Sequence, residues 1–263
     1  MIADLLRVTI LGSGTSSGVP MIGCSCPVCT STDQRNRRTR CSVLVGLRER
    51  NILIDTATDL RQQALREQIT QIDAVLYTHA HADHTHGIDD LRAFNPAGGG
   101  TLPIYADAST LTVIRRAFAY IFSDDAAMGY RPRLAPRLID TPVTICGFPV
   151  EPLPLRHGHE SSLGYRIGNF AYLTDCSAIP AETLTRLENL DVLILDGLRF
   201  RPHVSHFNIT QAIDMAQIIG ARRTLLTHLT HDIDHAKHAA ELPAGIEFAY
   251  DGLRLELPLT AAI

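Results

Sequence analysis

The 263-residue sequence has no tryptophan, only 6% aromatic residues and no long apolar run. A helix that crosses a membrane needs about 20 consecutive apolar residues, and charged residues interrupt this chain before any segment reaches that length. Near the start, Asp4 and Arg7 divide the apolar stretch that a secretion signal would need. We therefore expect no membrane association and a cytoplasmic location.

A surplus of positive charge is also missing. The 24 Lys and Arg residues are outnumbered by 28 Asp and Glu residues, which gives a formal net charge of −4. Because proteins dedicated to nucleic acids usually carry a basic surplus, we do not expect stable nucleic-acid binding. Arg35, Arg37, Arg38 and Arg40 form a local basic run. A solvated face is the simpler interpretation of this run, and steering of an anionic substrate is the alternative.

Histidine and cysteine are plentiful, with 12 and 6 residues. Cys24, Cys26 and Cys29 lie within six positions of one another. In a cytoplasmic protein, thiols spaced so closely are more typical of metal ligands than of disulfides. Cys41 and the pair Cys146 and Cys176 follow no such pattern, and we expect them in the core.

The overall composition, 45% hydrophobic and 20% charged, is that of an ordinary globular protein. Strand-like segments come in runs separated by helical segments, which predicts two mixed sheets with helices outside. Residues 41–46 and 51–55 predict a hairpin, and Asp251-Gly252 predicts a second one near the end of the chain. Asn208 is a candidate helix cap. The helices are expected at residues 59–71, 109–122, 180–190, 208–219 and 232–242.

The strand predicted at residues 73–78 leads directly into the sequence THAHADHTHG. His79 and His81 are two residues apart, so their rings point the same way in an extended segment. Asp83 and His84 are adjacent and point elsewhere as the chain turns into a helix. One short loop can therefore supply ligands to two neighbouring metal ions.

With this motif the sequence resembles the metallo-β-lactamase-fold hydrolases over nearly its whole length. In that superfamily the HxHxDH motif is followed by a lone His, a lone Asp and a last His, each at a strand end. His157, Asp175 and His228 stand at these places. The resemblance implies a four-layer αββα sandwich.

The resemblance also implies a dinuclear metal site in which Asp175 bridges the two ions. The remaining ligands would be His79, His81 and His157 for one ion, and Asp83, His84 and His228 for the other. Asp55, which closes a strand, matches the residue that braces the metal-binding loop. His159, two residues from His157, stays open as an alternative ligand.

The cysteine cluster, the GSGTSSG loop before it and the sequence THLTH at residues 227–231 narrow the resemblance. They are similar to the accessory phosphodiesterases of the carbon–phosphorus lyase pathway, which hydrolyse five-membered cyclic phosphates of ribose and cyclic nucleotides. That family implies a structural zinc on Cys24, Cys26, Cys29 and His231, in a loop of about residues 18–41. It also places His206 near the substrate phosphate. The pyrroloquinoline-quinone synthesis protein B family shares the cysteine cluster but departs from the active-site motif.

These features predict one domain, residues 1–263, that acts as a dinuclear metal-dependent phosphodiesterase. A metal-bridging hydroxide would hydrolyse a small ribose or nucleotide phosphodiester, cyclic ones included, with Asp83 and His206 as catalytic residues. Imidazole and carboxylate ligands suit Zn or Mn, and the thiolate site favours Zn. The alternatives are a hydrolase of the same fold acting on a thioester, a lactam or an RNA 3′ end, and a non-catalytic metal-binding accessory protein of cofactor biosynthesis. The expected partner is the small-molecule substrate, and a homodimer is compatible with the sequence.

Overall fold

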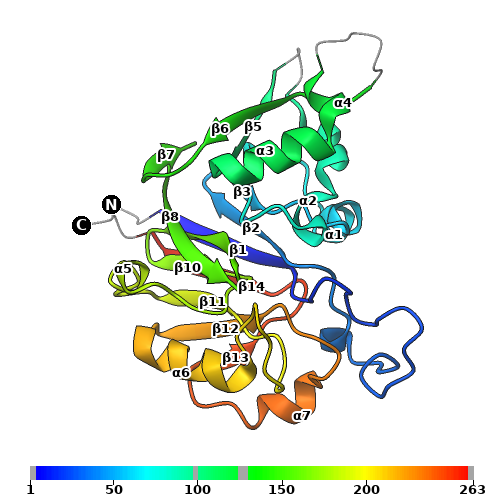
Figure 1. Ribbon diagram of the computed structural model, residues 1–263, viewed down its shortest axis with the longest axis vertical. Helices are drawn as coiled ribbons and strands as arrows, with labels where there is room; N and C mark the ends of the chain where they lie inside the picture. The colour runs from blue at the N-terminus through cyan, green and yellow to red at the C-terminus, as the bar shows by residue number, and fades with distance from the viewer. Residues whose placement is uncertain (1–3, 97–99, 124–129, 260–263) are drawn as a thin grey trace.

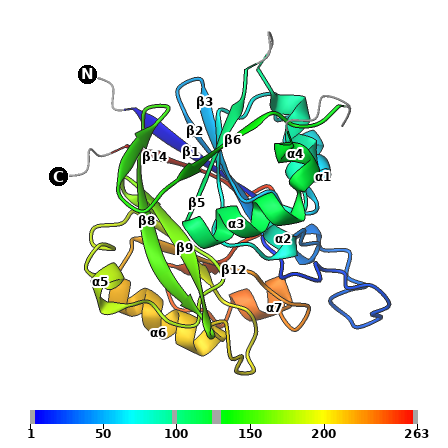
Figure 2. The same cartoon turned by 45° about the horizontal axis from the view of Figure 1, so that its top comes forward.

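The computed structural model describes residues 4–96, 100–123 and 130–259, so the predicted domain of residues 1–263 includes short stretches outside the described residues (Figure 1). Two sheets of seven strands each lie between helices on both outer sides (Figures 1 and 2). The αββα sandwich expected from the sequence is thereby confirmed.

The strand order of each sheet mixes early and late parts of the chain. The first sheet consists of β14 (Arg254–Pro258), β1 (Leu5–Gly12), β2 (Ser42–Leu47), β3 (Arg50–Ile54), β4 (Ala74–Leu76), β5 (Leu102–Ala106) and β6 (Leu134–Leu138). The second consists of β13 (Ile246–Phe248), β12 (Arg223–Thr227), β11 (Val192–Asp196), β10 (Phe170–Leu173), β9 (Glu160–Ile167), β8 (Phe148–His157) and β7 (Val143–Ile145).

The helices divide between the two outer faces (Figure 2). On the side of the first sheet lie α1 (Leu60–Arg66), α2 (Ala82–Thr85), α3 (Ala108–Ala117), α4 (Ala119–Phe122) and the 3-10 helix η2 (Ile88–Phe94). On the side of the second sheet lie α5 (Ala181–Leu184), α6 (Ile209–Ile219) and α7 (His235–Ala239). The long loop after β1, dark blue in Figure 1, extends beside the sandwich and contains the 3-10 helix η1 (Gln34–Asn36).

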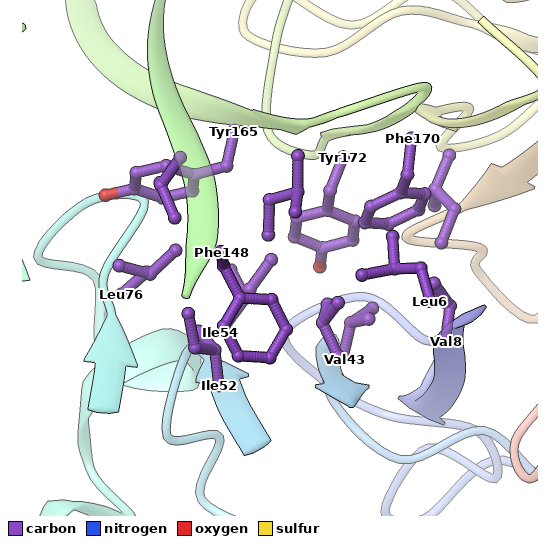
Figure 3. Close-up of a cluster of buried hydrophobic side chains, with 14 of the residues drawn as sticks. Leu6, Val8, Val43, Ile52, Ile54, Leu76, Phe148, Tyr165, Phe170 and Tyr172 are labelled. Carbon is purple, nitrogen blue, oxygen red and sulfur yellow. The ribbon is translucent and has the colours of Figure 1, made fainter. Parts of the chain in front are cut away.

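Alternation along the strands builds the core in layers, because successive strand side chains point to opposite faces. On β3, Ile52 and Ile54 lie in the cluster between the sheets, whereas Leu53 packs in the cluster under the helices of the first sheet. On β11, Ile194 faces the other sheet, and its two neighbours pack beneath α6. Figure 3 shows the inner cluster, in which aromatic rings from β8, β9 and β10 meet aliphatic side chains from β1 to β4.

Parallel pairing brings the functional strand ends to one side of the sandwich. β3 pairs in parallel with β4, and β10 with β11, which in turn pairs in parallel with β12. The carboxyl ends of parallel strands meet at the same sheet edge. Asp55, Asp175 and His228 immediately follow such strands or lie one residue further on, so the topology gathers them at one edge.

The first predicted hairpin is confirmed, and the second is wrong. Leu47 of β2 pairs with Arg50 of β3, which leaves a two-residue turn. By contrast, β13 pairs with β12 in the second sheet, while β14 pairs with β1 in the first. The Asp251 carboxylate accepts hydrogen bonds from the backbone N–H groups of Ser13 (2.9 Å) and Thr39 (2.9 Å), which fixes the Asp-Gly segment as a crossover between sheets.

The sequence predicts several helix ends correctly, but most of the predicted helices are too long. The predicted cap is confirmed, since Asn208 and Gln211 form a reciprocal capping box before α6. The helix expected at residues 180–190 stops at Leu184, because the carbonyl groups of residues 186 and 188 accept hydrogen bonds from Arg166 instead. The helix expected at 59–71 ends before Gln68, which has a left-handed backbone with φ of 55°.

Two further helices also differ from prediction. The segment 109–122 breaks into α3 and α4 at Phe118, whose φ and ψ of −116° and 42° are not helical. The segment 232–242 becomes helical only at His235, because the Asp234 side chain caps the helix by accepting from the N–H of Lys237.

The isolated cysteines do not all lie in the core. Cys41 and Cys176 are buried as predicted, but Cys146 is exposed. It occupies the tight turn between β7 and β8, where Cys146 and Gly147 both have positive φ, 52° and 90°. A turn of this kind lies at the surface, which explains the failed prediction.

Candidate active site

The loop after β4 brings the first group of histidines together. His79 and His81 lie in the extended segment before α2, and His157 ends β8 on the opposite sheet. The ligand atoms of all three lie within 4.8 Å of one another. His159 is exposed at the β8–β9 turn, whereas His157 is buried beside the other two. Of these two histidines, His157 therefore occupies the position that the motif requires.

A second group forms beside the first. Asp83 and His84 lie in the one-turn helix α2, and His228 follows β12. Their ligand atoms also lie within 4.8 Å of one another. The motif residues thus separate onto two neighbouring groups, as the spacing of the sequence predicts.

Asp175 lies between the two groups. One carboxylate oxygen, Oδ1, is 3.2 Å from His84 Nε2, and the other, Oδ2, is 3.4 Å from His228 Nε2 and 3.8 Å from His79 Nε2. A carboxylate in this position can ligate two cations at once. The structure therefore brings together all seven residues for which the sequence suggested active-site metal binding.

Three residues at this edge have left-handed backbones. The φ angles of Asp55, Asp175 and His228 are 63°, 52° and 62°. Non-glycine residues rarely adopt this conformation, and such strained positions are concentrated at functional sites. All three residues lie in the turns that follow strands β3, β10 and β12.

Buried hydrogen bonds orient the first ligands. Asp55 accepts from the Thr78 N–H (2.8 Å), the Thr78 hydroxyl (2.8 Å) and His84 Nδ1 (2.7 Å). His157 Nδ1 donates to the Ser205 carbonyl at 2.8 Å. Because each Nδ1 is bound in this way, Nε2 of both His84 and His157 is left for the cluster. Asp55 thus lies where the sequence predicted a supporting residue.

The charges within the cluster are strongly coupled. Burial opposes ionisation of Asp175, yet His228 and His84 hold the pKa of that carboxyl well below its usual range. Burial likewise opposes a charged His228, but Asp175 and Asp83 raise its pKa to about 8. The pKa of His79 is lowered well below its usual value by burial and by the neighbouring His84. The site therefore favours anionic carboxylates that require positive charge nearby.

Several imidazole nitrogens of the cluster residues lack hydrogen bonds. Among the described residues, His84 Nε2 and both ring nitrogens of His228 are buried without a hydrogen-bond partner. An unsatisfied buried polar group costs about 1–3 kcal/mol. Bare imidazole nitrogens beside ionised carboxylates are the donor set that divalent metal ions prefer. The residues present therefore fit divalent metal ions.

His206 lies against this cluster. Its Nδ1 is 2.7 Å from Asp196 Oδ2, its Nε2 is 3.9 Å from Asp175 Oδ2, and its ring stacks on that of His228 with centroids 4.6 Å apart. Asp196 is a residue that the sequence interpretation missed. It is buried at the end of β11, and the only signal was a lone Asp closing an apolar strand.

A separate cluster joins three cysteines of the loop after β1 to His231, which follows β12. His231 Nδ1 is 3.2 Å from the sulfur of Cys24 and 3.5 Å from those of Cys26 and Cys29. A backbone hydrogen bond from Cys29 lowers the pKa of Cys26 to about 6, whereas burial raises the pKa of Cys29 to about 11. Three thiols and one imidazole at these distances form a set suited to tetrahedral zinc.

The interpretation of the arginine run as a solvated face fails at Arg38. This side chain is only 1% exposed and donates to the carbonyls of Thr230 (3.0 Å) and Ile233 (2.8 Å) and to the side chain of Asn36 (3.0 Å). The buried guanidinium of Arg38 supplies hydrogen-bond donors to carbonyl groups that are distant in the sequence. It ties the cysteine-bearing loop to the segment that carries His228 and His231.

Comparison with known proteins defines the class. The beta-lactamase superfamily domain matches residues 50–229, and the chain belongs to this superfamily.

Among the described residues, none of the helices has the length and hydropathy needed to cross a membrane.

Similar solved structures indicate where the chain belongs within this superfamily. The chain is 42% identical to a solved structure described as a new diphosphatase from the PhnP family, with a TM-score of 0.91, over 97% of this chain and 98% of that one. This similarity and the shared fold place it among metallo-β-lactamase-fold hydrolases related to the PhnP family. Zn²⁺-bound PqqB from Methylobacterium extorquens shares the fold, with 21% identity, a TM-score of 0.76 and coverage of 95% of this chain and 100% of that one.

A longer relative bears a different name. The chain is 42% identical over 252 residues to a protein of Porphyromonas gingivalis strain ATCC BAA-308 / W83 named Octanoyltransferase. The match covers 94% of this chain but only 51% of that protein. The name thus describes a protein of which this chain spans about half the length.

Proposed function

We propose that this chain is a metal-dependent phosphodiesterase that hydrolyses small ribose or nucleotide phosphodiesters, five-membered cyclic phosphates included. The observation that carries the proposal is the position of Asp175 between two groups of three potential ligands. Two cations about 3.5–4 Å apart are the usual arrangement for hydrolysis of phosphate esters. The relationship to a PhnP-family diphosphatase supports the same reaction class.

The ligand assignment follows from the two groups. His79, His81 and His157 would hold one divalent ion, Asp83, His84 and His228 the other, and Asp175 both. Divalent ions so held lower the pKa of water and neutralise charge on the phosphoryl oxygens. Zn or Mn suits these ligands. The Cys and His cluster would hold a structural zinc in the loop of about residues 18–41.

The side chains around these ligands have separate tasks. Asp196 fixes the ring of His206 through Nδ1 and leaves Nε2 facing the cluster. We assign His206 either to bind the phosphate or to donate a proton to the leaving oxygen. A proton donor is needed because an unprotonated alkoxide is a poor leaving group. Asp83 is the more accessible of the two carboxylates, with a side chain 13% exposed against 3% for Asp175. We therefore assign Asp83 as a ligand and as the carboxylate that an entering substrate would meet first.

A substrate panel tests the reaction class. Purified, metal-loaded protein is offered bis-p-nitrophenyl phosphate, 2′,3′-cyclic and 3′,5′-cyclic nucleotides, p-nitrophenyl phosphate, an octanoyl thioester and a lactam. We expect hydrolysis of the diesters, fastest for 2′,3′-cyclic nucleotides, and none of the monoester. Faster turnover of the thioester or the lactam than of every diester would overturn the proposal.

A further inference from the structure

The Asp175 carboxylate has to point in one particular direction to lie between the two ligand groups. Oδ1 is close to His84, whereas Oδ2 is close to His228 and His79. The last torsion of an Asp side chain has broad minima, so the carboxylate plane rotates at little cost unless a partner fixes it. An orientation suited to both groups before any cation binds therefore needs a partner within the protein.

Hydrogen bonds on both sides of Asp175 fix its main chain. Ser162 lies in the neighbouring strand β9, and its buried hydroxyl donates to the Asp175 carbonyl at 2.8 Å. The N–H of Cys176 donates to Asp196 Oδ2 at 2.8 Å. These bonds hold the left-handed turn that follows β10. They do not fix the rotation of the Asp175 carboxylate.

Thr174 supplies the missing partner. This residue lies between β10 and Asp175 and is fully buried. Its Oγ1 donates to Asp175 Oδ1 at 2.7 Å, a length typical of a hydroxyl bound to an ionised carboxylate. Within the described residues, this is the only hydrogen bond that a hydroxyl or a backbone N–H makes to this carboxylate. Because threonine is branched at Cβ, its first torsion is restricted, and the direction of the hydroxyl is therefore restricted too.

The same hydrogen bond leaves the carboxylate able to bind cations. A carboxylate has about four lone-pair sites, and Thr174 occupies one of them on Oδ1. Oδ2, which faces His79 and His228, receives no bond from Thr174. The hydroxyl group thus orients the carboxylate without blocking either oxygen.

We propose that Thr174 is a positioning residue for metal binding, whose hydroxyl holds the Asp175 carboxylate between the two ligand groups. The inference rests on the proposed metal-dependent function and adds a residue to it. Partners that orient metal ligands typically contribute about 10–100-fold to metal affinity or activity. We expect a contribution in the same range from Thr174.

Zinc affinity, measured on the whole chain without substrate, tests the inference. Zinc is titrated into wild type, Thr174→Val, Thr174→Ala and Thr174→Ser in competition with a chromogenic chelator. Val preserves the size of the side chain and Ala does not, but both lack the hydroxyl. Both variants should therefore bind at least one zinc ion about 10–100-fold more weakly. Thr174→Ser keeps the hydroxyl and should bind zinc nearly as tightly as the wild type. The cysteine cluster is the same in all four proteins, so a difference between them reports on the His and Asp cluster.

Thr183→Val is the control for loss of a buried hydroxyl. Thr183 lies in α5 on the outer side of the second sheet, and its Oγ1 donates to the Pro154 carbonyl at 2.7 Å. This variant should lower the urea midpoint of unfolding, because a carbonyl loses its donor, and should leave zinc affinity unchanged. Wild-type zinc affinity in both Thr174→Val and Thr174→Ala would overturn the inference. A loss in Thr174→Ser as large as that in Thr174→Val would do the same.

Hydrolysis of bis-p-nitrophenyl phosphate separates this inference from the proposed reaction. Because the hydroxyl acts through metal binding, added zinc should restore the kcat of Thr174→Val, and the KM for the diester should change little. A kcat that stays low at zinc saturation would overturn the assignment to metal binding. If the wild type hydrolyses no diester but Thr174→Val binds zinc more weakly, the phosphodiesterase proposal fails and the role of Thr174 stands.

Discussion

The His and Asp cluster and the Cys and His cluster are built in different ways. Donors of the first come from the ends of strands in both sheets, are mostly buried and are oriented by buried hydrogen bonds such as those of Asp55. Three of the four donors of the second come from one loop, whose own apolar cluster contains only Val19, Val28 and Cys29 as buried members. The sandwich itself therefore shapes the first cluster, whereas metal binding would have to stabilise the second.

The two clusters nevertheless share one segment. His228 belongs to the first and His231 to the second, and the buried Leu229 between them donates its N–H to the Ser13 carbonyl at 2.9 Å. Arg38 binds the carbonyls of Thr230 and Ile233 from the cysteine-bearing loop. Changes in the loop can thus reach the active site through this segment.

The largest effect is expected from removing one of the two carboxylates in the active-site cluster. Asp175→Ala or Asp83→Ala should lower metal content and turnover together, by more than the about 10–100-fold that loss of a supporting residue costs. Elemental analysis and diester hydrolysis measure both. Asp89→Asn, in a surface ion pair with Arg92, is the control and should change neither. Full metal content and full rate in Asp83→Ala would contradict its assignment.

His206→Ala should keep the metal content yet lose about 10²–10⁴-fold in rate, the usual range for one acid–base group. The leaving group distinguishes the two roles. If His206 donates a proton, the loss should shrink for p-nitrophenolate, which needs little protonation. If it only binds phosphate, the loss should be the same for good and poor leaving groups. If His206→Ala hydrolyses substrates with poor leaving groups at the wild-type rate, His206 takes no part in the reaction.

Asp55→Asn should have a milder effect, about 10–100-fold in metal affinity or activity. The amide preserves the size of the side chain but weakens its hold on His84 Nδ1 and Thr78. Metal titration followed by activity measures the loss. An effect as large as that of Asp175→Ala would show that Asp55 does more than orient ligands.

The smallest effect on chemistry is expected in the loop. Cys26→Ser should lower the urea midpoint of unfolding, because structural zinc binding is coupled to folding. Activity per folded molecule should fall by less than in Asp55→Asn. Cys146→Ser, at an exposed turn, is the matched control and should leave stability nearly unchanged. Equal midpoints for the two variants would exclude a structural metal in the loop.

Structural features that depend only on residues close together in the sequence could be predicted from it. The hairpin of β2 and β3, the cap at Asn208 and the separation of His79 from Asp83 all follow from short-range rules. His157 and Asp175 have no local signal, and only the family resemblance indicated them. What marks Asp175 physically is a left-handed backbone after a strand, which appears only in the folded chain.

Long-range partners explain what the sequence did not predict. Asp196 is a lone Asp until the fold places it beside His206. The sequence gives no sign that Arg38 is buried, because its acceptors, the carbonyls of Thr230 and Ile233, lie almost two hundred residues away. The Asp-Gly turn signal near the C-terminus is genuine, but the pairing of β14 with β1 depends on which sheet edge is free.

Metal stoichiometry tests the two-cluster account most directly. Protein loaded with zinc and freed of excess metal by dialysis should contain three equivalents per chain, of which Cys26→Ser lacks one and Asp175→Ala lacks at least one of the other two. Elemental analysis of the three proteins gives the answer. One equivalent in the wild type, or the same zinc content in wild type and Cys26→Ser, would contradict it.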